Sequence, residues 1–177
     1  PRAALGYSFS PLLVVVERLG IVPGKGKDLP SVLETLKELR DILGPHNPEA
    51  KNPAKQLARK LWGKLPVIYG ATGITDVVAE RWKGQINENG KHPAYFNAFP
   101  ELNHNEIMGY EGNPDLLRNL ELVILRSPNE KERIRKRVEI TRELIEGLVS
   151  GLTEITPQGA TALSQMFYLI MYGDYVS

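Results

Sequence analysis

The sequence predicts an α/β protein built as a three-layer α/β/α sandwich, with a parallel sheet between two layers of helices. From residue 65 onward, short apolar runs alternate with segments whose apolar residues recur at the 3.6-residue period of a helix. The run at 121–127, ELVILRS, is almost continuously apolar, which is typical of a strand covered on both faces. The chain has 177 residues, the size of one domain.

The first sixty residues are predicted to be helical. A helix is expected over 11–19, after Ser10, and a Gly/Pro/Lys loop follows it. The next helix begins near Pro30, because proline suits the first helical turn, and Gly44 ends it. Its apolar stripe consists of Val32, Leu36, Leu39 and Leu43. A short third helix is expected over 54–62.

The remaining elements alternate between strands and helices. The strands are predicted at 65–71, 94–99, 121–127 and 151–157. The helices are predicted at 74–89, 129–148 and 160–172. Trp62 and Trp82 fall on apolar helix faces and are expected in the core. The last helix is apolar on almost every side, so it must be buried against other elements.

Composition excludes several classes of function. The formal net charge is +1, so no bulk field attracts nucleic acid or an anionic membrane. The sequence has no cysteine, which excludes disulfides and thiolate catalysis and fits a cytoplasmic protein. No apolar run approaches the roughly 20 residues that a membrane-spanning helix needs.

The segment YGATGITD, at 69–76, lies between a predicted strand and a predicted helix. Gly70 and Gly73 permit a tight turn, and the hydroxyl of Thr72 with the first N–H groups of the helix could bind an anion. The simpler interpretation is a turn in which Thr72 caps the helix. Thr72 is therefore a weak candidate for substrate binding.

The segment 86–107 is unusually polar and admits three interpretations. It contains Glu88, Glu101, His104 and Glu106 among the asparagines Asn87, Asn89, Asn97, Asn103 and Asn105. These residues could cap helices and cover a solvated loop, or Glu101, His104 and Glu106 could bind a metal ion. The spacing matches no zinc signature. The third interpretation is acid–base catalysis, in which a carboxylate and an imidazole each move a proton.

Position favours the acid–base interpretation. Glu88 falls at the end of a predicted helix, and His104 lies beyond the strand that follows. In a parallel sheet, ligands usually bind beyond the carboxyl ends of the strands. Arg2 would be interpreted as a solvated residue on its type alone.

Four segments together resemble a known enzyme family. They are PRAALGY (1–7), INENGK (86–91), FPELNHNEI (99–107) and MYGDYVS (171–177). Their order and spacing resemble the bifunctional phosphoglucose/phosphomannose isomerases, which contain two sugar isomerase (SIS) domains. The resemblance implies that 1–177 is the second SIS domain, with a flavodoxin-like architecture.

The family's phosphate-binding segments have no counterpart here. The sequence contains neither a G-x-G-G-S-G segment nor an S-x-S-G-N-T turn, and no D-P-T-P-like turn with a lysine follows MYGDYVS. We therefore expect that an N-terminal SIS domain and a C-terminal tail are absent from this chain.

The resemblance also implies an activity, which is the interconversion of glucose 6-phosphate or mannose 6-phosphate with fructose 6-phosphate through a cis-enediol. Glu88 would carry a proton between C1 and C2, Arg2 would stabilise the enediolate, and His104 would open the sugar ring in the neighbouring subunit of a homodimer. No metal or cofactor is expected. The alternatives are a non-catalytic module that senses a sugar phosphate and a domain used only for dimerisation.

Overall fold

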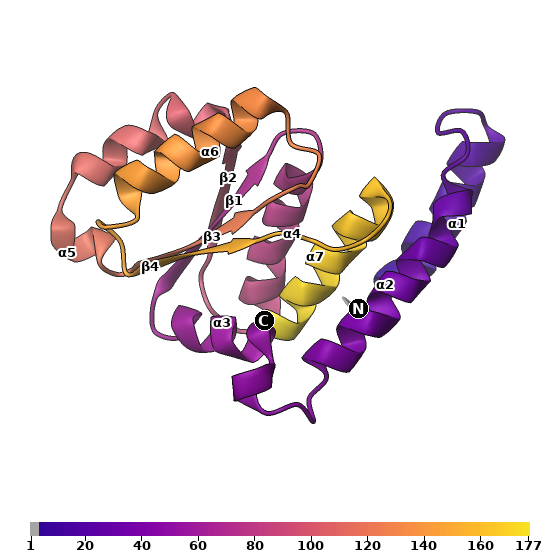
Figure 1. The fold of residues 1–177 in the computed structure, drawn as a ribbon, viewed down its shortest axis with the longest axis horizontal. Helices are drawn as coiled ribbons and strands as arrows, with labels where there is room; N and C mark the ends of the chain where they lie inside the picture. The colour runs from indigo at the N-terminus through magenta and orange to yellow at the C-terminus, as the bar shows by residue number, and fades with distance from the viewer. Residues whose placement is uncertain (1–3) are drawn as a thin grey trace.

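The computed structural model describes residues 4–177, and in this part of the chain four parallel strands lie between two layers of helices (Figure 1). The strands are β1 (Leu65–Ala71), β2 (Tyr95–Phe99), β3 (Leu120–Leu125) and β4 (Gly151–Ile155). Their spatial order is β2-β1-β3-β4. The chain moves outward from β1 to β2 and returns to β3 on the other side of β1. The predicted sandwich is confirmed, and each strand matches its predicted range to within two residues at either end.

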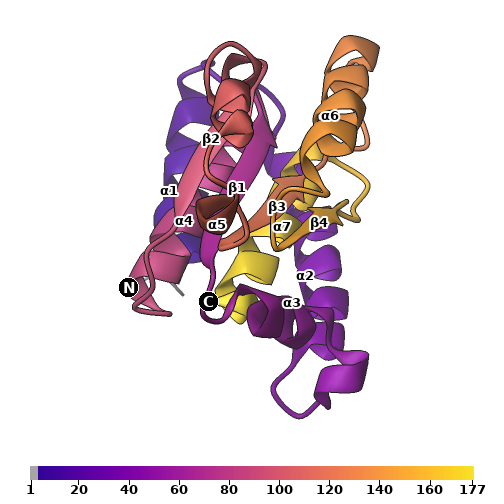
Figure 2. The same cartoon turned by 90° about the vertical axis from the view of Figure 1, so that its left-hand side faces the viewer.

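The helices form two layers on opposite faces of the sheet (Figures 1 and 2), and each layer has its own apolar core. One layer contains α2 (Leu29–Leu43), α3 (Pro53–Leu61), α4 (Thr75–Glu88) and α7 (Ala162–Val176). The other contains η4 (Glu101–Asn103), η5 (Glu106–Glu111), α5 (Pro114–Leu117) and α6 (Glu132–Ile145). Two further 3-10 turns are η2 (Gly26–Asp28) and η3 (Glu49–Lys51). None of the helices within residues 4–177 is long and apolar enough to cross a membrane.

The central strands β1 and β3 show why their sequences are continuously apolar. Successive side chains of a strand point to opposite faces of the sheet. Ile68 and its partner Val123 belong to the core beneath α4 and α7, whereas Tyr69 and its partner Ile124 belong to the core beneath α6. Both faces are covered, so neither strand has a solvated side that would favour polar residues.

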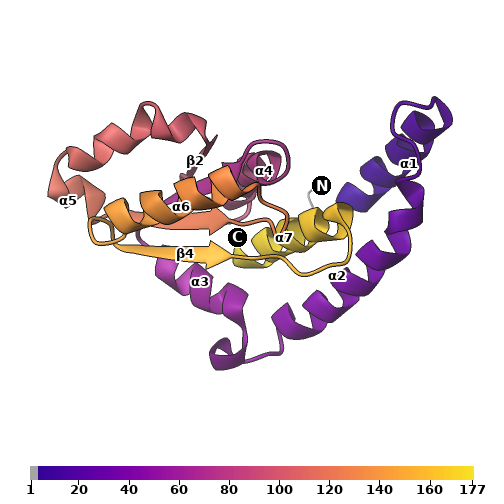
Figure 3. The ribbon, with the colours of Figure 1, turned by 45° about the horizontal axis from the view of Figure 1, so that its top comes forward.

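The last helix, α7, packs against the three other helices of its layer, α2, α3 and α4, as Figure 3 shows. The indole N–H of Trp82 donates a hydrogen bond of 2.8 Å to the carbonyl of Leu169, and the Trp82 ring stacks on Tyr172. The predicted burial of this helix is confirmed. Its predicted end at 172 is wrong, because α7 continues to Val176 through Gly173, which packs closely against α4.

The first helix begins earlier than predicted. Helix α1 spans Leu5–Arg18, with Pro11 in its interior, although the Ser-Pro pair at 10–11 favoured a start there. Proline in a helix interior costs about 3 kcal/mol. Packing opposes this cost, because Leu13 is buried and Phe9 makes an edge-to-face contact with Phe167 of α7.

The two tryptophans have different environments. Trp82 is fully buried, as predicted, but Trp62 is 82% exposed, so its predicted core position is wrong. Helix α3 ends at Leu61, and Trp62 follows it with an extended backbone. The helical period that holds Leu57 and Leu61 against the core therefore no longer applies at position 62.

Candidate functional site

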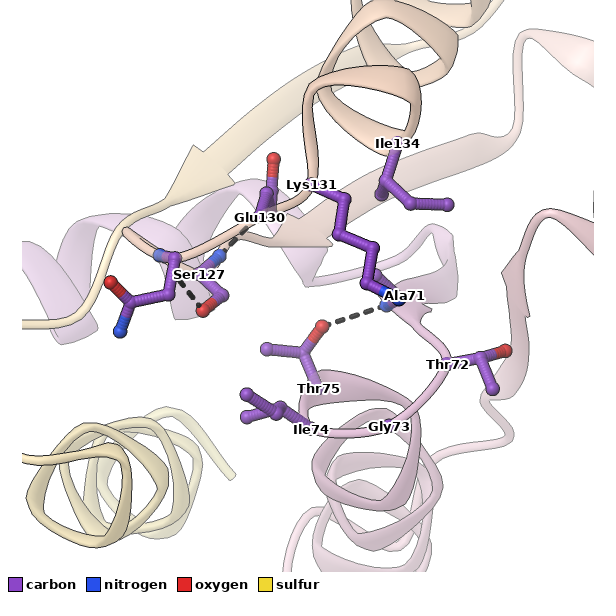
Figure 4. Close-up of a pocket in the computed structure, with 10 residues that line it drawn as sticks. Ala71, Thr72, Gly73, Ile74, Thr75, Ser127, Glu130, Lys131 and Ile134 are labelled. Carbon is purple, nitrogen blue, oxygen red and sulfur yellow. Dashed lines mark hydrogen bonds between the residues drawn. The ribbon is translucent and has the colours of Figure 1, made fainter.

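The β1–α4 turn borders a hollow of about 360 Å³ at the carboxyl ends of β1 and β3 (Figure 4). This is the point where the strand order reverses, which is the usual ligand crevice of an open α/β sheet. Gly70 allows the turn to fold back, since a Cβ there would lie 2.3 Å from the carbonyl oxygen of Thr75. Gly73 has φ +108°, a conformation that side chains other than glycine's rarely adopt.

Thr72 joins this turn to the end of β2. Its hydroxyl and its backbone N–H both donate to the carbonyl of Phe99, at 2.9 and 3.0 Å. The interpretation of Thr72 as the cap of α4 is therefore wrong, and the hydroxyl of Thr75 instead accepts from the N–H of Ala71 at 2.7 Å. Substrate binding by Thr72 stays a prediction, and it would use the lone pairs of a hydroxyl whose proton is already donated.

The opposite wall of the hollow follows β3. Figure 4 shows Lys131 extending toward the β1–α4 turn. The carboxylate of Glu130 instead accepts from the N–H of Ser127 and pairs with Arg126 at 2.7 Å. These contacts raise the pKa of Arg126, chiefly through its hydrogen bond with Glu130. The wall is thus held by a largely buried ion pair.

Glu88 lies at the opposite end of the sheet from the hollow, near the amino ends of the strands. Helix α4 begins beyond the carboxyl end of β1 and runs back across the sheet for 14 residues, a rise of about 21 Å. Glu88 is its last residue, and its side chain is exposed. It lines a surface hollow of about 290 Å³ along α4, which Arg81 and Gln85 also line.

The end of α4 is held against the end of α7. The amide of Gln85 donates to the carboxylate of Asp174 at 2.6 Å and to the carbonyl of Ile170 at 2.9 Å. One residue beyond Glu88, Asn89 donates to the hydroxyl of Ser177 at 2.8 Å. The MYGDYVS segment therefore supports the region around Glu88. Arg2, the predicted third catalytic residue, lies outside the described residues.

His104 lies near the carboxyl edge, in the connection between β2 and β3. Its side chain is exposed, and its backbone N–H donates to the carbonyl of Glu101 at 2.8 Å. Buried Leu102 precedes it by two residues, and Glu106 follows it by two. Glu88 and His104 are thus not brought together within one chain, because α4 and β2 separate them across the sheet.

Glu106 is hydrogen-bonded to the first of two linked, buried tyrosines. One of its carboxylate oxygens accepts from the hydroxyl of Tyr69, and the other accepts from the amide of Asn97. The hydroxyl of Tyr69 also bonds that of Tyr110. The hydrogen bonds of the Glu106 side chain therefore run to β1 and β2.

The two tyrosines were not identified as site residues from the sequence. In the sequence, Tyr69 occupies one position of a predicted buried strand. A buried phenol needs a hydrogen-bond partner, and this requirement could have indicated a polar contact there. Burial raises the pKa of Tyr69 far above its ordinary value, and Tyr110 and Glu106 raise it further. Burial also raises the pKa of Tyr110 to about 12. Both phenols therefore keep their protons at neutral pH.

The metal interpretation of this segment gains no support. Among residues 4–177, no group of three or more His, Asp or Glu side chains is placed to hold a metal ion. Glu101, His104 and Glu106 are close in sequence but do not form such a group.

Comparison with known families gives one match over most of the chain. Residues 50–177 match the family described as bacterial phospho-glucose isomerase C-terminal SIS domain. The bifunctional phosphoglucose/phosphomannose isomerase of Caldicellulosiruptor bescii is 50% identical over 177 residues, which is 52% of that protein. The enzyme of the same name from Aquifex aeolicus is 35% identical over 178 residues, or 51% of its length. The chain spans about half the length of the curated relatives it matches.

A solved structure has the same fold. The glucose-6-phosphate isomerase like protein from Thermus thermophilus superimposes with a TM-score of 0.73 at 27% sequence identity. The superposition covers 89% of this chain and 52% of that one. The likeness thus extends beyond the residues that match the family, and again involves half of a longer protein.

Proposed function

Because the chain belongs to the family of bacterial phospho-glucose isomerase C-terminal SIS domains, we propose that it forms the second half of a hexose 6-phosphate isomerase. The full-length protein would interconvert fructose 6-phosphate with glucose 6-phosphate or mannose 6-phosphate in the cytoplasm. The observation that carries the proposal is the 50% identity, over the whole chain, to an enzyme named for both isomerisations. The phosphate group would be bound by an N-terminal SIS domain outside these 177 residues.

The proposed chemistry is a proton transfer between two adjacent carbons. The carboxylate of Glu88 removes a proton from C1 of open-chain fructose 6-phosphate, and the C–H electron pair forms the C1–C2 double bond while the C2=O π pair moves onto O2. O2 takes up a proton, which gives the cis-enediol, and O1–H then loses one, so that in effect one proton moves from O1 to O2. As the C1=O bond forms, the C1–C2 electron pair takes the proton back from Glu88 at C2, which produces an aldose. The face of C2 that receives the proton decides between glucose and mannose 6-phosphate. No step requires a metal ion.

Arg2 and His104 would assist at the oxygens. A guanidinium is permanently charged, so Arg2 would stabilise the negative charge that develops on the enediolate. His104 would exchange a proton with the ring oxygen and open the ring.

The position of Glu88 and His104 supports a homodimer. Glu88 lies near the amino ends of the strands and His104 near their carboxyl ends. They are separated by the length of β2, whose five residues rise about 16 Å. One hexose cannot contact both side chains of the same chain. In a two-fold dimer, His104 of one subunit could complete the site that holds Glu88 of the other.

The decisive experiment mixes two impaired variants of the full-length protein. Glu88→Gln and His104→Gln should each keep a measurable fraction, about 1% or less, of the wild-type kcat in a coupled assay on fructose 6-phosphate. After unfolding and refolding together, half of the dimers should be mixed, and each mixed dimer should hold one intact site. About a quarter of the wild-type activity should therefore return.

Two results would contradict the proposal. If both residues act within one chain, the mixture stays as impaired as its components. If wild-type protein binds fructose 6-phosphate but converts it to neither aldose, the sensing alternative replaces the enzyme.

A further inference from the structure

We propose that Glu106 positions His104, through a polar cluster that Glu106 forms with Tyr69, Tyr110 and Asn97 and that we call the carboxylate–phenol clamp. The proposal rests on the function proposed above and assigns a positioning role to four residues that have no role in it. None of the four side chains needs to touch the substrate. Their role is to hold the backbone from which the His104 imidazole projects.

The connection that carries His104 needs such support. Residues 100–119 link β2 to β3 with two 3-10 turns, η4 and η5, and the single helical turn α5. Short 3-10 segments have poorer hydrogen-bond geometry than α-helices and do not define a rigid element alone. Neither η4 nor η5 has a side-chain cap at its start. The position of this connection therefore depends on where its side chains are anchored.

Three anchors flank His104 along the chain. Leu102, two residues before His104, is fully buried among apolar side chains of the α6 layer. The amide of Asn103 donates to the hydroxyl of Thr141 on α6 at 2.8 Å. Glu106, two residues after His104, is bonded to β1 and β2 through the clamp. Of these anchors, only the clamp connects the segment to the sheet by hydrogen bonds.

The clamp has a single direction of proton donation. An ionised carboxylate only accepts hydrogen bonds, so Tyr69 must donate its one proton to Glu106. The oxygen of Tyr69 then accepts from Tyr110, and Asn97 donates to the second carboxylate oxygen. Each donor has one acceptor, and no arrangement with a neutral amide in place of Glu106 satisfies all of them. The carboxylate therefore specifies one position for the segment.

Burial makes a shifted clamp costly. Tyr69 is fully buried and Tyr110 is 6% exposed, so a displaced η5 would leave phenol hydroxyls without partners away from water. The edge-to-face contact between Tyr69 and Phe99, at 6.0 Å, also ties the clamp to the end of β2, from which the connection departs. Movement of His104 relative to the sheet thus requires breaking buried hydrogen bonds.

The test compares Glu106→Gln and Tyr69→Phe with wild type in the full-length protein, using the coupled assay on fructose 6-phosphate. The glutamine has the same shape, but its N–H group either faces the N–H of Asn97 or reverses the chain of phenols and leaves the O–H of Tyr110 without an acceptor in the clamp. If the imidazole is displaced by about 1 Å, kcat should fall by about 10- to 100-fold while KM changes little. Tyr168→Phe is the matched control, because it removes a half-buried phenol hydroxyl from α7, in the opposite layer. Its kcat should equal that of wild type.

A double-mutant cycle separates positioning from general damage. In a His104→Gln background, Glu106→Gln should cause no further loss of kcat, because the residue it positions is already absent. An equal loss in both backgrounds overturns the proposal. The proposal is also overturned if Glu106→Gln and Tyr69→Phe both have the kcat of wild type. Failure of the proposed function is a different result, in which wild type itself converts none of the three sugar phosphates.

Hydrogen exchange tests the clamp without an activity assay. In Glu106→Gln, the backbone amides of residues 103–108 should exchange faster than in wild type, while those of β1 and β3 keep their protection. Unchanged exchange of residues 103–108 in a folded variant shows that the clamp does not hold this segment. That outcome overturns the proposal whatever the activity.

Discussion

Glu88 and His104 are held by two different kinds of structure. Glu88 ends a 14-residue α-helix that packs along its length on the sheet and on α7. His104 projects from a connection of short 3-10 turns whose place depends on buried side chains. Backbone hydrogen bonds of a regular helix position the first residue, and a few specific side-chain contacts position the second.

This difference predicts how substitutions should affect each region. Near Glu88, support is spread over an apolar interface between two helices, so damage there should appear as lost stability. Near His104, support is concentrated in the clamp, so small polar changes should alter geometry more than stability. The predictions below test this contrast, beginning with the largest effect.

Removal of the Glu88 carboxylate should have the largest effect on activity. We expect Glu88→Gln to lower kcat by about 10²- to 10⁴-fold, the usual contribution of a general base. Because the side chain is exposed, the melting temperature should stay close to that of wild type. The coupled assay and thermal unfolding of the full-length protein measure the two quantities. Full activity of Glu88→Gln would show that another group carries the proton.

Gly173→Ala should destabilise the support of Glu88. A Cβ at this position would lie 2.4 Å from the side-chain oxygen of Gln85 and 2.6 Å from the indole nitrogen of Trp82. Overpacking of this kind costs about 1–3 kcal/mol of unfolding free energy, measurable by urea denaturation. Gly84→Ala is the control, because its added Cβ would have nothing within 4 Å beyond its two chain neighbours and the backbone of its own helix, and alanine favours the helix. Equal stability of the two variants would contradict the close packing of α4 and α7.

Tyr110→Phe should have a smaller effect on the His104 region. It removes one hydrogen bond and leaves Tyr69 donating to Glu106. We expect a loss of about 0.5–1.5 kcal/mol of unfolding free energy. A loss as large as that of Gly173→Ala would show that the clamp supports the whole fold and not only the segment around His104.

Alkaline pH should have the smallest of the four effects, a gradual weakening of the clamp. The pKa of Tyr110 rises from 10.0 to about 12 on folding, mainly through burial. A raised folded-state pKa contributes stability that is complete below pH 10 and is lost as pH rises toward 12. The pH dependence of unfolding free energy should therefore be shallower in Tyr110→Phe than in wild type over this range. Parallel curves of unfolding free energy against pH would show that folding does not change the pKa of Tyr110.

Much of the fold was predictable because local patterns and tertiary packing agree. The strand at 65–71 and the helices around it follow directly from the period of their apolar residues. The start of α1 was not predictable, because Pro11 marks a helix start locally and tertiary packing of Leu13 and Phe9 offsets its cost. Trp62 was misplaced because a helical period carries no information about the residue where the helix ends.

The sequence by itself determined the α/β class, the parallel sheet and the family, since each depends on patterns of residue type along the chain. Glu88 and His104 could also be proposed from it. Only the tertiary structure decided that these two residues lie at opposite ends of the strands, because that depends on the direction in which α4 crosses the sheet. Only it showed that Glu106 bonds Tyr69 across 37 positions of sequence. Hydrogen bonds between distant residues leave no periodic signal, so they become visible only when the chain is folded.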